Sequence, residues 1–390
     1  MVMKTVYVGM SGGVDSSVAA MLLLEQGYNV VGVYMKNWSR DLPGMKCPWA
    51  EDLADAKRVA VKLGIDFLVW DFEKEYHDKV VEYMLREFKA GNTPNPDIMC
   101  NQEIKFKLFY EKAMGAGADF IATGHYARVV GEQAKCNFLR DGVPRSRRHG
   151  ARTPHTSVVT SGSPQKVHSC LLAPTLARAV DENKDQTYFL YRISEEALAH
   201  TLFPIGGMMK PEVKKLAKER GLHNAYKKES MGVCFVGEVG MKDFLKEYIE
   251  VEPGEIREIE TDRVLGYHEG AVFYTIGQRH GLYISGGLPY YVVKKDVQNN
   301  IVYVSKNLNN DELWTDELSL HDVFMRNADD GSSDELPKKQ LLVRLRHRAP
   351  LIPATFDGET LHFEQKIKKP ASGQSAVFYD GEVCLGGGII

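Results

Sequence analysis

The segment Ser11–Ser17, which reads Ser-Gly-Gly-Val-Asp-Ser-Ser, carries the residue types that bind an anion. Its adjacent glycines let the backbone approach a ligand closely, and the helix expected from Val14 presents unpaired N–H groups. No lysine stands where a Walker-type phosphate loop has one, so that motif is excluded. Because a carboxylate would repel phosphate unless a cation intervenes, Asp15 is a candidate Mg²⁺ ligand. The alternative is a structural glycine turn at the start of a buried helix.

Two cysteines in glycine- or proline-punctuated segments are candidate reactive thiols. Cys100 follows a Thr-Pro-Asn-Pro-Asp-Ile-Met run, and Cys234 lies in a Gly-Val-Cys-Phe-Val-Gly run. We expect a helix to begin at Asn101, which would favour the Cys100 thiolate through the helix N-terminus. Asp97 either caps that helix or contacts the substrate and exchanges a proton with it. Taken singly, each cysteine is also compatible with a buried, unreactive thiol.

Strands alternate with helices in the first part of the chain. This alternation predicts a parallel, doubly wound sheet. The expected strands are Thr5–Met10, Asn29–Tyr34, Ile65–Trp70 and Asp119–Thr123, and the expected helices start at Val14 and cover Glu51–Leu63, Lys74–Ala90 and Asn101–Met114.

In the rest of the chain, the sequence pattern changes from one that predicts helices to one that predicts short strands. Helices are expected at Ser194–His200, Pro211–Arg220 and Met241–Ile249. Short strands between Gly, Asn and Asp turns then predict a barrel-like β tail. These strands are Ala271–Tyr274, Tyr290–Lys294, Ile301–Val304, Leu341–Arg346 and Ala376–Tyr379. We therefore predict an α/β domain over residues 1–200, a small helical or mixed linker domain over 201–270 and a C-terminal β domain over 271–390.

Composition bounds the class of protein. The 390 residues are 44% hydrophobic and 26% charged, which is typical of a folded globular chain rather than a disordered one. No apolar run approaches the roughly 18 residues of a membrane helix, so we expect no membrane partner. Six cysteines without a CxxC pair indicate a reducing, cytoplasmic setting. The net charge of −3 means that any nucleic-acid surface must be local.

Three stretches supply local positive charge. Residues 133–178 hold eight Lys/Arg and one acid without periodicity, which indicates either a disordered or erroneous insertion or a basic RNA-contacting loop. A second cluster is either an RNA surface or a solvated helix face, and its members are Lys210, Lys214, Lys215, Lys218, Arg220, Lys227 and Lys228. The alternation Arg344, Arg346, Arg348 places three cations on one face of the expected strand, where they fit phosphate contacts.

Several of these motifs carry a resemblance to known enzymes. The Ser11–Ser17 segment resembles the pyrophosphate loop of the N-type ATP pyrophosphatases, which cleave ATP to AMP and pyrophosphate. With the two cysteine segments, the chain resembles the tRNA-specific 2-thiouridylases (the MnmA family), which place sulfur on the wobble uridine of certain tRNAs. Further matching segments are Gly32–Trp38, Ala122–Ala127, Asp181–Phe189, Tyr274–Arg279, Gly373–Tyr379 and Leu385–Gly388.

The resemblance implies an ATP site, a base site and two catalytic thiols. The base site would be Asn95, Pro96 and Asp97, with Cys100 as nucleophile and Cys234 as carrier of a persulfide sulfur. Releasing that sulfur would join Cys100 and Cys234 in a transient disulfide. Mg²⁺ would accompany ATP. The ATP-binding residues would be Gly9, Met10, Ser11, Gly12, Gly13, Val14, Asp15, Ser16, Met35 and Gly124.

The same resemblance implies tRNA contacts and partners. The contacts would be Lys184, Asp185, Gln186, Arg346 and His347, and His347 departs from the tyrosine usual in the family. The tRNA would be a Lys, Glu or Gln isoacceptor. A cysteine desulfurase or a relay protein would deliver sulfur to a monomeric enzyme.

Two other functions are compatible with parts of the sequence. One is an N-type ATP pyrophosphatase that acts on a small molecule, as argininosuccinate and GMP synthetases do, although such an enzyme has no use for a thiol pair. The other is a catalytically inactive RNA-binding module. For thiolation, a uracil C2 oxygen is a poor leaving group until it carries AMP, which is why an ATP cradle and thiols are needed together. His125 is expected to have a structural role near the nucleotide.

Overall fold

A five-stranded parallel sheet forms the centre of the first domain in the computed structural model, which describes residues 3–41, 47–131, 174–228, 241–284, 288–326 and 339–390. The strand order is β3-β2-β1-β4-β7, and every pairing is parallel. The predicted doubly wound sheet is therefore confirmed. Its strands are β1 (Thr5–Gly9), β2 (Asn29–Lys36), β3 (Asp66–Asp71), β4 (Phe120–Thr123) and β7 (Thr201–Leu202).

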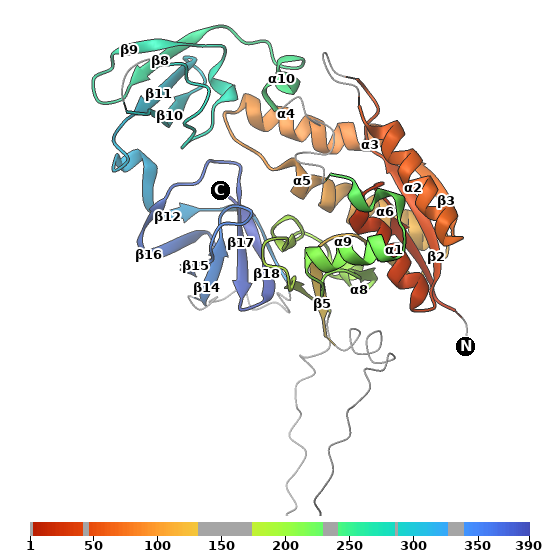
Figure 1. Cartoon of the computed structure of the whole chain (residues 1–390). Coiled ribbons are helices and arrows are strands. Elements are labelled where there is room, and N and C mark those ends of the chain that lie inside the picture. Colours follow the sequence, from red (N-terminus) through yellow and green to blue (C-terminus); the bar gives the residue numbers. More distant parts are fainter. Residues whose placement is uncertain (1–2, 42–46, 132–173, 229–240, 285–287, 327–338) are drawn as a thin grey trace, which may run out of the picture.

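Helices cover both faces of this sheet (Figure 1). Alternation along β1 explains the two layers, because Val6 and Val8 pack on one face and Tyr7 packs on the other. The Val6 face is covered by α1 (Val14–Glu25), α2 (Trp49–Leu63) and α9 (Lys210–Glu219). The Tyr7 face is covered by α3 (Glu73–Tyr76), η1 (His77–Val81), α4 (Glu82–Lys89), α5 (Pro96–Met99), η2 (Cys100–Leu108), α6 (Phe109–Gly115) and α8 (Glu195–Ala199).

A four-stranded sheet of order β10-β11-β8-β9 follows helix α10 (Met241–Lys246). The predicted strand over residues 271–274 is wrong, because Ala271–Phe273 form a 3₁₀ turn (η5) whose first N–H is held by the Asn300 side chain. The predicted boundary after residue 270 lies between β9 and β10 of this one sheet. The strands are β8 (Gly254–Glu258), β9 (Val264–His268), β10 (Tyr291–Asp296) and β11 (Ile301–Ser305).

The C-terminal strands form a larger antiparallel sheet that the first domain completes. The hairpin β5 (Ala127–Val130) and β6 (Thr175–Arg178) leaves the α/β domain and pairs with β18 through Ala177 and Val383. The last four residues of the stretch 133–178 are thus a strand, and its residues 133–173 lie outside the described residues. The other strands are β12 (Trp314–Ser319), β13 (His321–Met325), β14 (Lys339–Arg344), β15 (Ile352–Phe356), β16 (Thr360–Lys368), β17 (Ser375–Asp380) and β18 (Val383–Ile389).

The three parts of the chain meet around α4 and α5 (Figure 1). Three short 3₁₀ turns complete the described elements: η3 (Thr187–Phe189), η4 (His223–Tyr226) and η6 (Asp311–Leu313). Within the described ranges, no helix combines the length and apolar character that a membrane crossing requires.

Candidate active site

The loop between β1 and α1, which holds the predicted anion cradle Ser11–Ser17, is closely packed at Gly12, and the end of β4 packs on it at Gly124. Gly12 has φ +76°, and a Cβ on it would lie 2.3 Å from the Asp52 carbonyl oxygen. Gly124 follows β4, and a Cβ there would lie 2.5 Å from the Ser16 backbone nitrogen. The end of β4 therefore packs directly on the first turn of α1, where N–H groups are unpaired.

Hydroxyls inside the cradle fix its shape. Ser17 donates a hydrogen bond to the Gly13 carbonyl at 2.9 Å, and Ser16 donates to the same carbonyl at 3.2 Å. Ser11 is exposed, and its hydroxyl lies 3.3 Å from that of Ser16. Asn224 of η4 donates from Nδ2 to the Gly12 carbonyl and to the Ser17 hydroxyl, both at 2.9 Å. The sequence analysis did not find Asn224, whose only signal is its position after α9.

Lys210 supplies the cation that the cradle sequence lacks. Its Nζ lies 2.7 Å from both carboxylate oxygens of Asp15, and Tyr126 donates to the same carboxylate at 3.1 Å. The Lys210 side chain is 8% exposed, and its backbone N–H donates to Asp181. The interpretation of Lys210 as part of an exposed basic cluster is wrong, because α9 packs it against the start of α1. A Mg²⁺ contact of Asp15 stays a prediction.

The rest of that predicted basic cluster is largely neutralised. Lys227 lies 2.7 Å from Asp52 and 2.6 Å from Asp55, and Arg220 lies 3.0 Å from Glu25. These pairs fasten α9 and η4 to α1 and α2. Because these cations are paired with carboxylates, this part of the surface fits the alternative of a solvated helix face better than that of an RNA surface.

The predicted adenosine residues lie at the carboxyl ends of neighbouring strands. Met35 lies near the end of β2, and a Cβ on Gly9 at the end of β1 would lie 2.9 Å from Met35 Cε. Gly124 directly follows β4, which pairs with β1. The sheet thus brings Met35, Gly124 and the cradle to one edge, where ligands of doubly wound sheets bind. This tight, glycine-lined edge fits an adenine nucleotide.

His125 is packed next to this edge. Its Nδ1 lies 2.8 Å from the Thr123 hydroxyl, and its ring contacts the rings of Phe106 and Phe203, which also contact each other. Burial lowers the pKa of His125 well below its ordinary value, and the Lys105 charge lowers it further. These contacts support the expected structural role.

A second site is a cavity of about 410 Å³ between the three parts of the chain. The predicted base residues Asn95, Pro96 and Asp97 line one wall, and the predicted tRNA pair Arg346 and His347 lines another. The fold therefore brings together two groups that are some 250 residues apart in sequence. Residues in the lining that the sequence analysis missed include Phe88, Phe189, Phe273, Thr275 and Gln374.

The wall formed by residues 95–97 begins a helix. The Asn95 side chain accepts from the Asp97 N–H at 3.2 Å, so Asn95 is the N-cap and Pro96 the first helical residue. The alternative that Asp97 caps the helix is wrong, since Asp97 stands in the first turn after the N-cap Asn95. Burial raises the pKa of Asp97, although Lys105 opposes the shift. This carboxyl group is thus easier to protonate than an exposed aspartate.

Cys100 lies one turn into this helical segment. The helix begins at Pro96 rather than at Asn101, and Cys100 opens a nine-residue π-helix, η2. The predicted activation of Cys100 by a helix N-terminus is therefore wrong, because its backbone N–H is already bonded within α5. The residue is 2% exposed. Cys234, the predicted persulfide carrier, lies outside the described residues.

His347 faces the cavity as an aromatic ring. Its centroid lies 4.5 Å from that of Phe189, with 42° between the planes. Burial, together with the charges of Arg348 and Arg344, lowers the pKa of His347 to about 4. His347 is therefore neutral at neutral pH, and its contact with tRNA stays a prediction.

The other predicted tRNA residues divide into surface and interior positions. Lys184 is partly exposed, and Gln186 exchanges hydrogen bonds of 2.9 Å with the Tyr126 backbone. Asp185 is 1% exposed, and Arg344 donates to its carboxylate at 2.7 Å. Because the Asp185 carboxylate is enclosed, the predicted tRNA contact of this residue stays a prediction for its backbone only.

The predicted face of three arginines on one strand is also wrong. Strand β14 ends at Arg344, whose side chain is 6% exposed in its ion pair with Asp185. Arg346 is exposed in the following bend, and Arg348 has φ +63° in a turn. Only Arg346 of the three lines the cavity.

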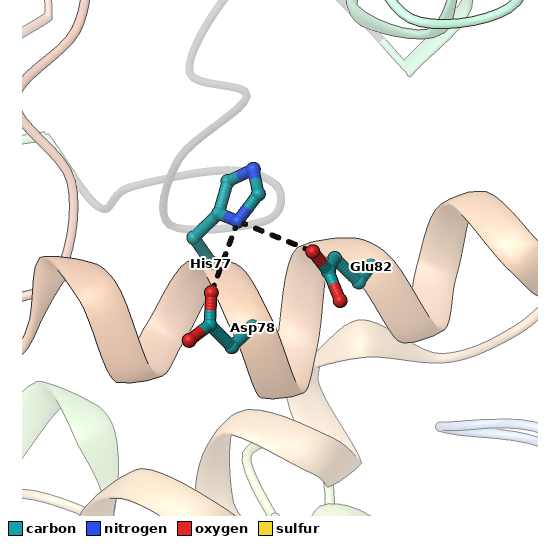
Figure 2. Close-up of side chains that lie close together, drawn as sticks. All are labelled: His77, Asp78 and Glu82. Atoms are coloured by element: carbon teal, nitrogen blue, oxygen red, sulfur yellow. Dashed lines mark hydrogen bonds and ion pairs between the residues drawn. The ribbon is translucent and has the colours of Figure 1, made fainter.

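Among the described residues, one group of three side chains has the types and spacing to hold a metal ion. His77 Nδ1 lies 3.4 Å from Asp78 and 3.8 Å from Glu82 on the helix η1–α4 (Figure 2). Asp78 already pairs with Lys74 at 2.6 Å. The group belongs neither to the cradle nor to the cavity, and we treat it as surface charge.

The sheet order, the glycine-lined cradle and the two appended β sheets define a nucleotide-binding α/β protein with β-barrel-type domains. Residues 4–148 and 155–238 match the family described as tRNA methyl transferase HUP domain. Residues 242–306 match the tRNA methyl transferase PRC-barrel domain, and residues 329–390 match the Aminomethyltransferase beta-barrel domain.

Full-length relatives agree with these matches. The chain is 41% identical to the tRNA-specific 2-thiouridylase MnmA of Bacillus subtilis (strain 168) over 388 residues, which cover 99% of this chain and 94% of the relative. It is 43% identical over 394 residues to the protein of the same name from Listeria monocytogenes serotype 4b (strain CLIP80459), with the same coverage. The chain belongs to the MnmA family of tRNA-specific 2-thiouridylases, which are sulfurtransferases.

Proposed function

We propose that this enzyme replaces the C2 oxygen of the wobble uridine (position 34) of tRNA by sulfur, at the expense of ATP. The observation that supports this most directly is the cavity that joins Asn95, Asp97, Arg346 and His347 beside the helix that carries Cys100. Its aromatic walls and neutral His347 suit a base that has left its stack.

The cradle residues would hold the nucleotide. Gly12, Gly13 and the first N–H groups of α1 would bind the phosphates, while Gly9, Met35 and Gly124 would frame the adenosine. Mg²⁺ would share the negative charge there, with Asp15 as its candidate ligand. When bound, ATP supplies the AMP group that makes the C2 oxygen a good leaving group, with release of pyrophosphate.

The side chains of the cavity would orient the base and move a proton. Asp97 has a raised pKa and lies where the resemblance places the target base, so it can exchange a proton with it. The two thiols would then deliver sulfur. The Cys100 thiolate would attack the inner sulfur of the Cys234 persulfide, so that a Cys100–Cys234 disulfide forms and the outer sulfur leaves with the electron pair of the broken S–S bond. With that electron pair the released sulfur would bond to C2, and AMP would leave with the former C2 oxygen.

The family resemblance implies the partners of this reaction. The substrate would be a Lys, Glu or Gln tRNA, and a cysteine desulfurase or a relay protein would recharge Cys234 in the cytoplasm of the cell. A reductant of the thiol class must reopen the disulfide after each turnover.

The test is nucleoside mass spectrometry of tRNA incubated with the protein, ATP, Mg²⁺ and a sulfur donor. We expect 2-thiouridine from the unaltered enzyme, and none from Cys100→Ser or Cys234→Ser. Cys47→Ser is the matched control, because Cys47 is a buried cysteine, as Cys100 is, but lies just before α2 rather than on the helix beside the cavity. Full ATP-dependent turnover in both catalytic-thiol variants would favour a small-molecule ATP pyrophosphatase instead.

A further inference from the structure

A cavity of about 390 Å³ lies next to the base cavity and is formed by the same three parts of the chain. Its walls are the loop after α4, the strand β10 with its following turn, and the segment that precedes β17. Thr93 lines both cavities, which makes them neighbours. Neither the resemblance nor the comparisons assigns a ligand to this second cavity.

The walls of the second cavity are fastened together. Gly91 has φ +87°, and a Cβ on it would lie 2.8 Å from Val297 of the β10–β11 turn. The Thr93 N–H donates to the Ser372 carbonyl at 2.7 Å, and Gln374 donates to the Thr93 carbonyl at 2.6 Å. The cavity is therefore a built feature of the folded chain rather than a gap between loose domains.

Lys295 lines this cavity, and its ammonium group is buried in the cavity wall. A β-bulge between Val292 and Lys294 shifts the alternation of β10, so that Lys294 is exposed while Lys295 turns inward. The Lys295 Nζ has no exposed surface, and no hydrogen-bond partner for it is found in the described part of the chain. Burial lowers the pKa of Lys295 to about 8, so the amine still carries a proton at neutral pH.

An unpaired buried charge is costly, and nearby carboxylates do not offset it. Asp296 lines the cavity, but both its oxygens accept from Asn299, at 2.9 and 2.8 Å. Glu312 lines the cavity as an exposed residue. Lysines on an edge strand such as β10 also prevent edge-to-edge pairing, which accounts for the exposed Lys294 but not for the enclosed Lys295.

We propose that this second cavity binds a phosphate group of the RNA backbone, with Lys295 as its principal cation and Lys294 and Lys369 at its rim. The inference rests on the proposed function, because it takes tRNA as the ligand. The shared residue Thr93 places that phosphate beside the nucleotide in the base cavity. The four-carbon stem of Lys295 lets Nζ swing into the cavity when the anion arrives.

The test is the salt dependence of tRNA binding between 50 and 200 mM KCl. The slope of the logarithm of the binding constant against the logarithm of the salt concentration becomes shallower by about 0.7–0.9 when one phosphate contact is lost. Between 50 and 200 mM KCl, the variant should therefore lose about threefold less affinity than the unaltered enzyme. We expect this change for Lys295→Met and not for Lys295→Arg. Lys57→Met is the matched control, because Lys57 is an exposed lysine of α2 outside both cavities. Lys295→Met should fold, since it removes a buried unpaired charge.

The outcomes separate the inference from the function on which it rests. Equal slopes for Lys295→Met and the unaltered enzyme, with tRNA still bound and thiolated, would overturn the phosphate site alone. No binding of tRNA by the unaltered enzyme would overturn both. A second arm titrates inorganic phosphate and follows thermal unfolding. If inorganic phosphate stabilised the unaltered enzyme but not Lys295→Met, and the salt slopes of tRNA binding were equal, the ligand of the cavity would be a free anion and not an RNA phosphate.

Discussion

Substituting Lys210 by methionine removes the cation that α9 places in the anion cradle and keeps most of the apolar stem. The Asp15 carboxylate would retain the hydrogen bond from Tyr126 and, being 31% exposed, part of its hydration. We therefore expect a loss of about 1–2 kcal/mol in the free energy of unfolding, below the 3–5 kcal/mol for breaking a fully buried pair. Thermal or urea unfolding measures this loss.

The effect on activity should be much larger than the effect on stability. An ammonium at the start of α1 stabilises negative charge that develops on the phosphates, and losing one such group costs about 10²–10³ in kcat. The assay is tRNA-dependent release of pyrophosphate. Lys215→Met is the control, because Lys215 is exposed on the same helix and should remain within about twofold of the unaltered enzyme. A folded Lys210→Met variant that keeps more than a tenth of the activity would refute this reasoning.

Three further predictions concern the cradle and the base cavity. Gly124→Ala should destabilise the protein by about 1–3 kcal/mol and abolish ATP binding, because its Cβ would meet the Ser16 backbone; calorimetry with ATP checks both. Asp97→Asn should abolish thiolation but leave the affinity for tRNA within a few-fold of that of the unaltered enzyme. In the pH–rate profile of the unaltered enzyme, activity should be lost on acidification at a higher pH than an ordinary aspartate would give, because the pKa of Asp97 is raised. His347 has a pKa of about 4 when folded, against about 6.5 when unfolded, so the unfolded chain binds more protons between these values. Stability should therefore fall as pH drops from 7 to 5, by roughly 1 kcal/mol for this partly exposed group, and His347→Asn should remove that part of the unfolding profile.

The elements that could be predicted are those whose signals are local. The helix expected from Val14 is α1, and the strand expected at residues 29–34 is the core of β2. Both were predictable because the spacing of apolar residues and the glycines that end an element are properties of neighbouring residues. The cradle was predictable for the same reason. At Cys100 a local signal was misinterpreted, since Asn95 followed by Pro96 is itself a helix start.

The features that could not be predicted depend on partners far away in sequence. Nothing around Lys210 shows that it meets Asp15, 195 residues earlier. Arg344 alternates with two other arginines, so the pattern favoured an exposed face, but its partner Asp185 lies 159 residues away. A buried ion pair of this kind leaves no periodic trace in either segment. Only the fold decides which of several similar cations is enclosed.

These buried links also decide how the site is assembled. Thr187 and Tyr379 share a hydrogen bond of 3.1 Å, and Tyr188 donates to the Ser375 carbonyl at 3.0 Å, beside the Asp185–Arg344 pair. Each joins the segment after β6 to the C-terminal sheet, whose β18 already pairs with β6. Separating the two domains would leave several buried polar groups without partners, at about 1–3 kcal/mol each. These bonds therefore hold the wall that carries His347 in a fixed position relative to the helix that carries Cys100, so in the proposed function one connected structure would both recognise the base and transfer the sulfur.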